Sequence, residues 1–176
     1  RTESLTFSSR AGNVHQLVET LAMENKPMRE TDVDRILLGS GWRRDDHYLM
    51  IYLKLFASSG ITANTAYLCS KIEKMWKGSC TFPHDEGILW LLNLNLYQHS
   101  HDYPFYDTFA YFLRESLCQA GISNDYTDIG RTSLFIQQAK TALEIGGQKN
   151  PTHWYHYFKD YALDYMFSQC TLQFPA

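Results

Sequence analysis

The chain has 176 residues and a mass of 20.5 kDa, which corresponds to about one domain of ordinary size. Hydrophobic residues make up 44% and charged residues 20% of it, a composition that argues against a disordered chain. The formal net charge of −3 argues against a protein that coats DNA or RNA, and the longest apolar run, residues 88–92, is far shorter than the roughly 20 residues that span a membrane.

Two helices are predicted in the first part of the chain. Apolar residues recur every three or four positions after Asn13, which predicts an amphipathic helix that ends before Pro27. The apolar positions are Val14, Leu17, Val18 and Leu21. Thr31 predicts the N-cap of a second, short helix that stops at Gly39. We therefore expect residues 1–41 to form a helical lead-in.

The pattern changes to strands after Trp42. Residues 48–56 are rich in β-formers and almost continuously apolar, which predicts a central strand. A helix is predicted over residues 62–76. Two short strands follow, at residues 79–82 and 88–94, and the turn residues between them predict a hairpin.

The next segment combines a polar stretch with a strongly apolar helix. Residues 95–103 are predicted to form a polar loop, and Pro104 suits the first turn of the helix that follows. This helix carries the clearest apolar stripe in the chain, formed by Phe105, Phe109, Phe112, Leu113 and Leu117. We expect the stripe to lie in the core, and Cys118 to pack on the same helix.

The last third is predicted to contain a short strand, a loop, a helix, a strand and a final helix. The strand covers residues 121–123, and the first of the two helices covers residues 132–145. Gly146 and Gly147 are predicted to cap that helix. The closing strand is predicted over residues 154–158 and is followed by a short helix.

This order of elements defines the expected fold class. From Tyr48 it reads strand, helix, strand, strand, helix, strand, helix, which predicts an α/β (α+β) domain of ferredoxin-like or nucleotide-cyclase-like type. Its sheet is expected to be mostly antiparallel, with helices packed on it. The four cysteines, Cys69, Cys80, Cys118 and Cys170, are widely spaced and form no C-x-x-C motif. We expect free thiols and a cytoplasmic protein.

Three short motifs resemble a known family. Residues 120–123 followed by residues 137–143 and a glycine pair resemble the "G-[IV]-S … QA-x-x-AL-x-x-G" stretch of the GGDEF-like domain in bacterial transcriptional regulators of the PucR and CdaR type. Residues 154–161 are similar to the "x-x-Y-x-D" strand that closes that domain. The resemblance covers residues 42–170, so that residues 171–176 would begin a linker.

The resemblance implies a regulatory domain in the middle of a transcription factor. Such a domain lies between an N-terminal sensory region and a C-terminal helix-turn-helix, and it is a relic of the nucleotide-cyclase fold. The implied role is to relay a signal through self-association, with DNA bound only by a segment outside this chain. The start at Arg1 rather than Met fits a domain of a longer protein.

The hairpin between the second and third strands bears on catalysis. Diguanylate cyclases carry Gly-Gly-Asp-Glu-Phe there, because glycines let GTP approach the backbone and the carboxylates serve the metals. Asp85 and Glu86 are present here, but Pro83 and His84 stand where the glycines would be. The first strand offers Lys54 in place of a second metal-binding acid. We therefore expect no catalytic, cofactor-binding or metal-binding residue and no enzyme activity.

Two alternative functions remain open at this stage. One is a divergent nucleotide cyclase that still uses Asp85 and Glu86. The other is a small-ligand sensor with its pocket among the aromatic residues of segment 103–112. A sensor of this kind would be stabilised by its effector, since a ligand that binds only the native state raises the melting temperature.

Histidines offer the remaining candidates for metal ligands. His99, His101 and Asp102 form a cluster, but we favour a solvated loop because a closed metal site needs three or four ligands. His153 and His156 lie three residues apart among aromatic residues, and a surface or core pair is favoured for them.

Overall fold

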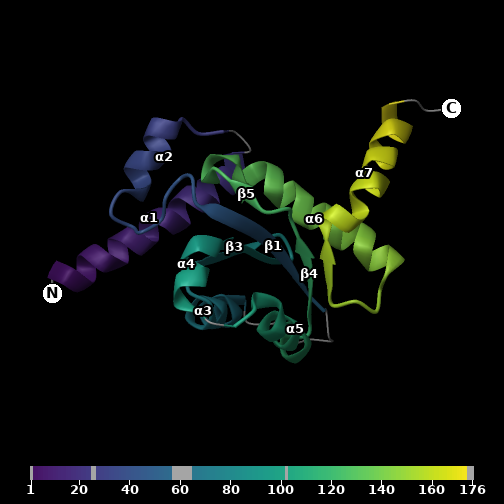
Figure 1. The fold of residues 1–176 in the computed structure, drawn as a ribbon, viewed down its shortest axis with the longest axis horizontal. Coiled ribbons are helices and arrows are strands. Elements are labelled where there is room, and N and C mark those ends of the chain that lie inside the picture. The colour runs from purple at the N-terminus through teal and green to yellow at the C-terminus, as the bar shows by residue number, and fades with distance from the viewer. Residues whose placement is uncertain (1, 25–26, 57–64, 102, 174–176) are drawn as a thin grey trace.

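The computed structural model describes residues 2–24, 27–56, 65–101 and 103–173 (Figure 1). The strands are β1 (His47–Leu55), β2 (Ser79–His84), β3 (Gly87–Asn93), β4 (Cys118–Ile122), β5 (Tyr126–Thr127) and β6 (Tyr155–Tyr157). The helices are α1 (Thr2–Glu24), α2 (Glu30–Leu37), α3 (Thr65–Met75), α4 (Leu94–Ser100), α5 (Phe105–Ser116), α6 (Thr132–Lys149) and α7 (Phe158–Gln173), with a 3₁₀ turn at Ile129–Arg131.

The strands form one mixed sheet in the order β2-β3-β1-β4-β6, with β5 beside the start of β1. All neighbours are antiparallel except β4 and β6, which are parallel. Strand β3 therefore lies between β1 and β2, and β1 lies between β3 and β4, which is the split β-α-β arrangement of a ferredoxin-like core. Helix α6 leads from β4 to the added strand β6. The predicted fold class is confirmed.

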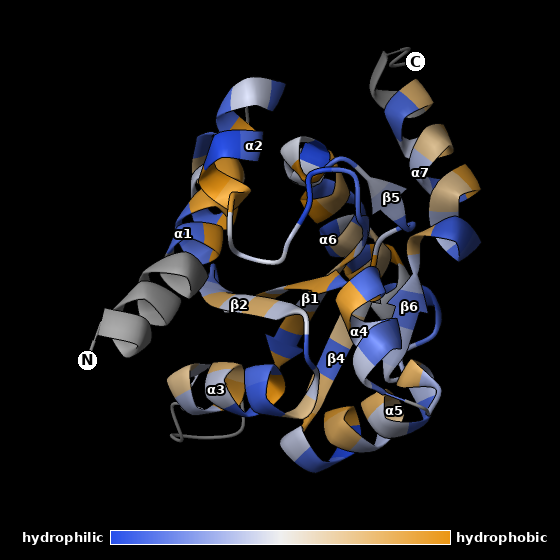
Figure 2. Cartoon of the chain, turned by 60° about the vertical axis from the view of Figure 1, so that its left-hand side comes forward, coloured by the Kyte–Doolittle hydropathy of each residue, from blue (hydrophilic) through white to orange (hydrophobic). Residues whose placement is uncertain are grey.

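Strand β1 is the centre of the sheet, as its apolar sequence predicts. Ile51 pairs with Trp90 of β3 on one side and with Ile122 of β4 on the other. Because both sheet faces are covered, successive side chains of β1 are buried on opposite faces. Figure 2 shows the resulting hydrophobic colouring along β1.

Two hydrophobic clusters lie on opposite faces of the sheet. On one face, α1, α2 and α6 pack on residues such as Met50 and Leu91. On the other, α3, α4 and α5 pack on residues such as Ile51 and Trp90. The helices predicted as a lead-in thus share a core cluster with the sheet, and α1 extends from Thr2, well before the start predicted after Asn13.

The prediction of a polar loop over residues 95–103 is wrong in part, because Leu94–Ser100 forms helix α4. Asn93 begins this helix: its Oδ1 atom accepts the N–H of Leu96 at 3.1 Å. Tyr97 is buried and turns the helix toward the core. Helix α4 has one buried aromatic residue and a side-chain N-cap, but no apolar stripe. The sequence pattern therefore did not predict this helix.

The end of α5 also differs from the prediction. Leu117 is the C-cap of the helix rather than a core position: it adopts φ 53° and is 52% exposed. Cys118 begins β4 instead of extending the helix, and its side chain is buried. The left-handed conformation of residue 117 ends the helix, a position where glycine is the usual residue.

The glycine pair in α6 does not cap the helix, which continues to Lys149. Gly146 is required by packing, because a Cβ atom there would lie 2.3 Å from Cγ of His156. Gly146 was predicted to end the helix. Its role in the structure is instead to let α6 approach the ring of His156 closely. The first residues of the helix predicted over residues 62–76 lie outside the described residues.

No helix in the described part of the chain is both long enough and apolar enough to cross a membrane.

Candidate functional site

The β2–β3 hairpin is the site that the sequence singled out. Its turn consists of Asp85 and Glu86, since His84 and Gly87 are still paired. Asp85 takes φ 52°. Gly87 sits so close to β1 that a Cβ atom would lie 2.0 Å from the Leu53 carbonyl oxygen, which explains why glycine follows the turn.

The carboxylate of Asp85 is engaged by a cation from α6. Nζ of Lys140 lies 2.5 Å from Oδ2 of Asp85 and 2.8 Å from Nε2 of His84. The same ammonium group lies 5.6 Å from the centre of the Tyr52 ring, within reach of a cation–π interaction. Lys140 therefore joins the hairpin, the central strand and α6.

The charges around Lys140 shift the titration of its neighbours. The hydrogen bond from Lys140, together with the charge of its ammonium group, lowers the pKa of Asp85. Burial, and then the Lys140 charge, lowers the pKa of His84. His84 is thus neutral at pH 7, with Nε2 accepting from Lys140.

A broad hollow of about 810 Å³ opens beside the hairpin. It is lined by Tyr52, Lys54, Asp85, Glu86, Gln119, Lys140, Leu143, Glu144, Gly147 and Gln148. Lys54 occupies the β1 position opposite Gly87, and its side chain is exposed. The hollow therefore combines carboxylates with two lysines. Within the described residues, no three His, Cys, Asp or Glu side chains are placed to hold a metal ion.

The structure separates the histidine candidates. His99 is exposed on α4, whereas His101 follows that helix and its Nε2 accepts the backbone N–H of Lys77 at 3.2 Å. The His101 ring packs against Tyr97 and Tyr103, with centroids 4.7 and 5.1 Å away. Asp102 lies outside the described residues. His101 thus has a structural role at the end of α4.

His153 and His156 differ in their surroundings. His153 is exposed in the turn before β6, whereas His156 is buried within β6 and packs against α6. Their rings are nearly parallel, with centroids 6.2 Å apart. Of this pair, His153 therefore lies on the surface and His156 lies in the core.

A third cluster joins residues far apart in the sequence at the β2 edge of the sheet. His15 of α1 and Glu73 of α3 lie 2.6 Å apart, and Glu73 accepts the backbone N–H of Thr81 in β2 at 2.9 Å. The Cys80 thiol also contacts His15; burial raises the pKa of this thiol, against a smaller lowering by His15. The cluster blocks further strand pairing at this edge. Only the sheet order could reveal it.

Three of the aromatic residues in segment 103–112, where a ligand pocket was considered, lie in the core instead. Phe105, Phe109 and Phe112 are buried against Trp76 and Trp90. The cysteines are free, as predicted: Cys69, Cys80 and Cys118 are buried and Cys170 is exposed.

The chain was compared with protein families, curated proteins and solved structures. No protein-family model, no curated protein and no solved structure matches the chain.

Proposed function

We propose that this chain is a non-catalytic regulatory domain of a bacterial transcriptional regulator of the PucR or CdaR type, which relays a signal to a helix-turn-helix outside the chain. The proposal rests on the GGDEF-like sequence resemblance together with the cyclase-like strand order. The observation that supports it most directly is the pairing of Asp85, in the β2–β3 hairpin, with Lys140 of α6.

The hairpin acts as a structural clip between the sheet and α6. Asp85 is paired with Lys140, and Lys54 lies on the strand where a second metal-binding acid would be needed. Two-metal chemistry on GTP requires carboxylates that grip both ions, and two lysines beside the hairpin oppose that arrangement. This charge pattern favours a relic of the cyclase fold over the divergent cyclase.

Helix α6 offers a physical route for a signal. It packs along the sheet and contacts both α1 and α7, the helices that lead toward the two ends of the chain. In Figure 1 these two helices extend toward opposite sides of the molecule. A rigid helix that touches both is suited to transmit a displacement of one to the other.

Exposed apolar side chains on α7 support self-association. Leu163 and Met166 are three residues apart, so they share one face of the helix, and they are 69% and 60% exposed. We expect the apparent mass in light scattering to rise with concentration, and Leu163→Glu to reduce that rise. A monomer at all concentrations would remove self-association from the proposal.

Product analysis with GTP tests the absence of catalysis. The chain is incubated with GTP and either Mg²⁺ or Mn²⁺ at high protein concentration, and cyclic dinucleotides are separated by chromatography. We expect no product from the natural sequence or from Glu86→Gln. Multiple turnovers that disappear in Glu86→Gln would overturn the proposal in favour of the cyclase alternative.

A further inference from the structure

A second hollow, of about 410 Å³, opens between α1 and the start of β2. Its walls come from parts of the chain that are distant in the sequence: Val14 and His15 of α1, residues 39–42 between α2 and β1, residues 77–80 at the start of β2, and Leu96 of α4. Figure 2 shows α1 next to β2, and the two elements are in contact. The volume is of the size that proteins use to bind small molecules.

One wall of the hollow is apolar and belongs to a single face of the sheet. Val14 and Cys80 are buried in the hydrophobic cluster on the α1 side of the sheet, and the half-buried Trp42 packs against the same cluster. The Trp42 ring is held by stacking on Tyr48, with centroids 5.9 Å apart. Because Val14, Cys80 and Trp42 all line the hollow, an apolar group inside it would be removed from water.

A neighbouring wall places a lysine beside another apolar side chain. Lys77 is exposed and directly precedes Gly78, where a Cβ atom would lie 2.9 Å from Cβ of Leu96. The backbone N–H of Lys77 donates to Nε2 of His101 at 3.2 Å, which holds the chain at this point. Since Lys77, Gly78 and Leu96 all line the hollow, a cationic group and an apolar surface border the same space.

The charges of the lining favour an anion. Lys77 is its only Lys or Arg, and the described lining contains no Asp or Glu. His15 is already paired with Glu73, which lies outside the lining, at 2.6 Å. In the described part of the chain no carboxylate forms an ion pair with Lys77. The ammonium group is therefore available to a carboxylate that approaches from solvent.

We propose that this hollow binds a small organic carboxylate with an apolar body about the size of one ring. The body lies against Val14, Trp42 and Leu96, and the carboxylate lies beside the ammonium group of Lys77. The site deepens the proposed regulatory function, on which it rests for its biological meaning, by naming the class of effector. Since α1 also contacts α6, occupancy would stabilise α1 at the start of the proposed signal route.

Three small probes separate the apolar body from the charge. Phenylacetate carries both, phenylacetamide has nearly the same shape without the charge, and acetate carries only the carboxylate. Each is titrated into the full chain by isothermal calorimetry. We expect saturable binding of phenylacetate, at least fivefold weaker binding of phenylacetamide, and no saturable binding of acetate.

Methyl signals in ¹H–¹³C spectra locate the bound probe. Val14 and Leu96 line the hollow, whereas Ile122 is buried in the cluster on the other face of the sheet. We expect phenylacetate to shift the methyl signals of Val14 and Leu96 with the same saturation as the calorimetric titration, and to leave those of Ile122 in place.

Two lysine variants form a matched pair. Lys77→Gln removes the charge from the hollow and is expected to weaken phenylacetate binding at least fivefold while leaving phenylacetamide binding unchanged. Lys74→Gln makes the same change in the last turn of α3, outside the lining, and should leave the binding of both probes unchanged. Both side chains are exposed, so both variants are expected to fold, and melting temperatures check this.

Several results would overturn the site. They are no saturable binding of phenylacetate, equal affinity for phenylacetamide, equal losses in Lys77→Gln and Lys74→Gln, or shifts at Ile122 without shifts at Val14 and Leu96. These outcomes are distinct from failure of the proposed function, which appears as GTP turnover.

Discussion

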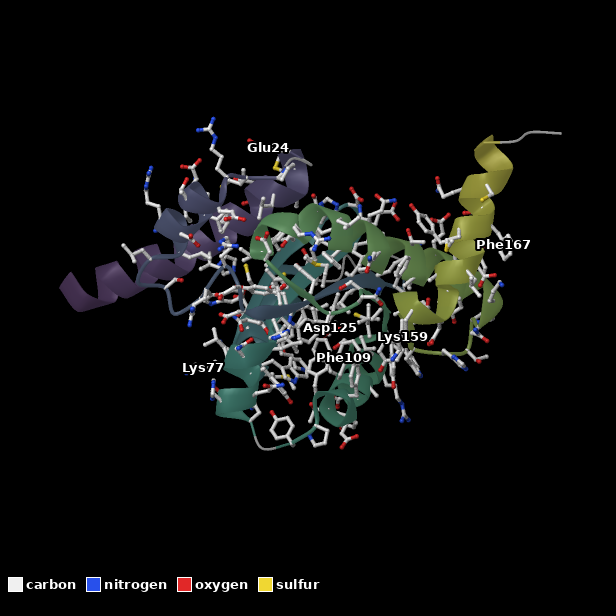
Figure 3. All side chains as sticks on the ribbon, turned by 45° about the horizontal axis from the view of Figure 1, so that its top comes forward. Glu24, Lys77, Phe109, Asp125, Lys159 and Phe167 are labelled. Atoms are coloured by element: carbon white, nitrogen blue, oxygen red, sulfur yellow. The ribbon has the colours of Figure 1, made fainter. Side chains whose placement is uncertain are left out.

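At the scale of single residues, Phe109 illustrates how the core depends on one position. Its side chain is fully buried, and its ring lies 4.9 Å from that of Phe105 and 5.6 Å from that of Trp90. Figure 3 shows Phe109 among the closely packed side chains inside the molecule, whereas Phe167 lies out on α7.

Phe109→Ala is expected to lower the free energy of unfolding by about 3–5 kcal/mol, because it removes a buried ring and leaves a cavity. Urea denaturation measures the change. Tyr111→Ala, two residues away on the exposed side of α5, should cost much less. Similar losses in both variants would show that this face of α5 is not the core.

Two glycines test the difference between packing and propensity. A Cβ atom at Gly121 would lie 1.9 Å from the Ala139 carbonyl oxygen of α6, whereas one at Gly147 would meet nothing within 4 Å. Gly121→Ala should therefore cost about 1–3 kcal/mol or more through overpacking. Gly147→Ala lies within α6 and should stabilise by about 0.5–1 kcal/mol. Thermal and urea unfolding of both variants measure the two signs, and destabilisation by Gly147→Ala would contradict the helical assignment.

Buried neutral histidines predict a loss of stability in mild acid. Burial lowers the pKa values of His156 and His84, with Lys140 adding to the effect on His84. The unfolded state then binds more protons than the folded state below pH 6.5, so the free energy of unfolding falls as the pH drops from 6.5 toward the lowered values.

Urea melts between pH 8 and pH 5 measure this dependence. His156→Gln cannot titrate at this position and should show a shallower fall, with the remainder due in part to His84. A constant free energy of unfolding across this range in the natural sequence would contradict the buried neutral state of His156.

At the scale of secondary-structure elements, the C-cap of α5 carries a residue that suits it poorly. Leu117 adopts a left-handed conformation that costs a non-glycine residue about 1–2 kcal/mol. Leu117→Gly is expected to raise the free energy of unfolding by about 0.5–1 kcal/mol, since the side chain is half exposed. Leu117→Val should lower it because a β-branched residue tolerates this conformation least. The reverse order of stabilities would contradict the left-handed cap.

The elements predicted from sequence are those with a strong local period. Strand β1 and the stripe of α5 follow directly from apolar spacing, and the β2–β3 hairpin follows from its turn residues. Helix α4 has no such period, because only Tyr97 is buried within it. Its N-cap at Asn93 was the available signal, and Asn93 is also part of a buried network in which its side chain donates to Asp46 at 2.9 Å.

At the scale of the whole molecule, charge pairing within the chain disfavours nucleic-acid binding. The net charge is −3, and Arg44 is already paired with Asp34 and Glu30 on α2. We expect no sequence-specific gel shift with this chain alone at any salt concentration between 50 and 200 mM, conditions chosen to expose phosphate contacts. A shift that weakens steeply with salt would contradict this expectation.

The amino-acid sequence by itself determined the fold class, the central strand β1 and the β2–β3 hairpin, because apolar periodicity and turn residues act over a few neighbouring positions. The tertiary structure decided what the chemistry-bearing residues do. Lys140 binds Asp85, which lies 55 residues away in the sequence. Glu73 pairs with His15 at the β2 edge of the sheet. His156 is buried in β6, and its Nε2 atom has no hydrogen-bond partner. Such contacts depend on which elements become neighbours in space, and local patterns carry no record of that.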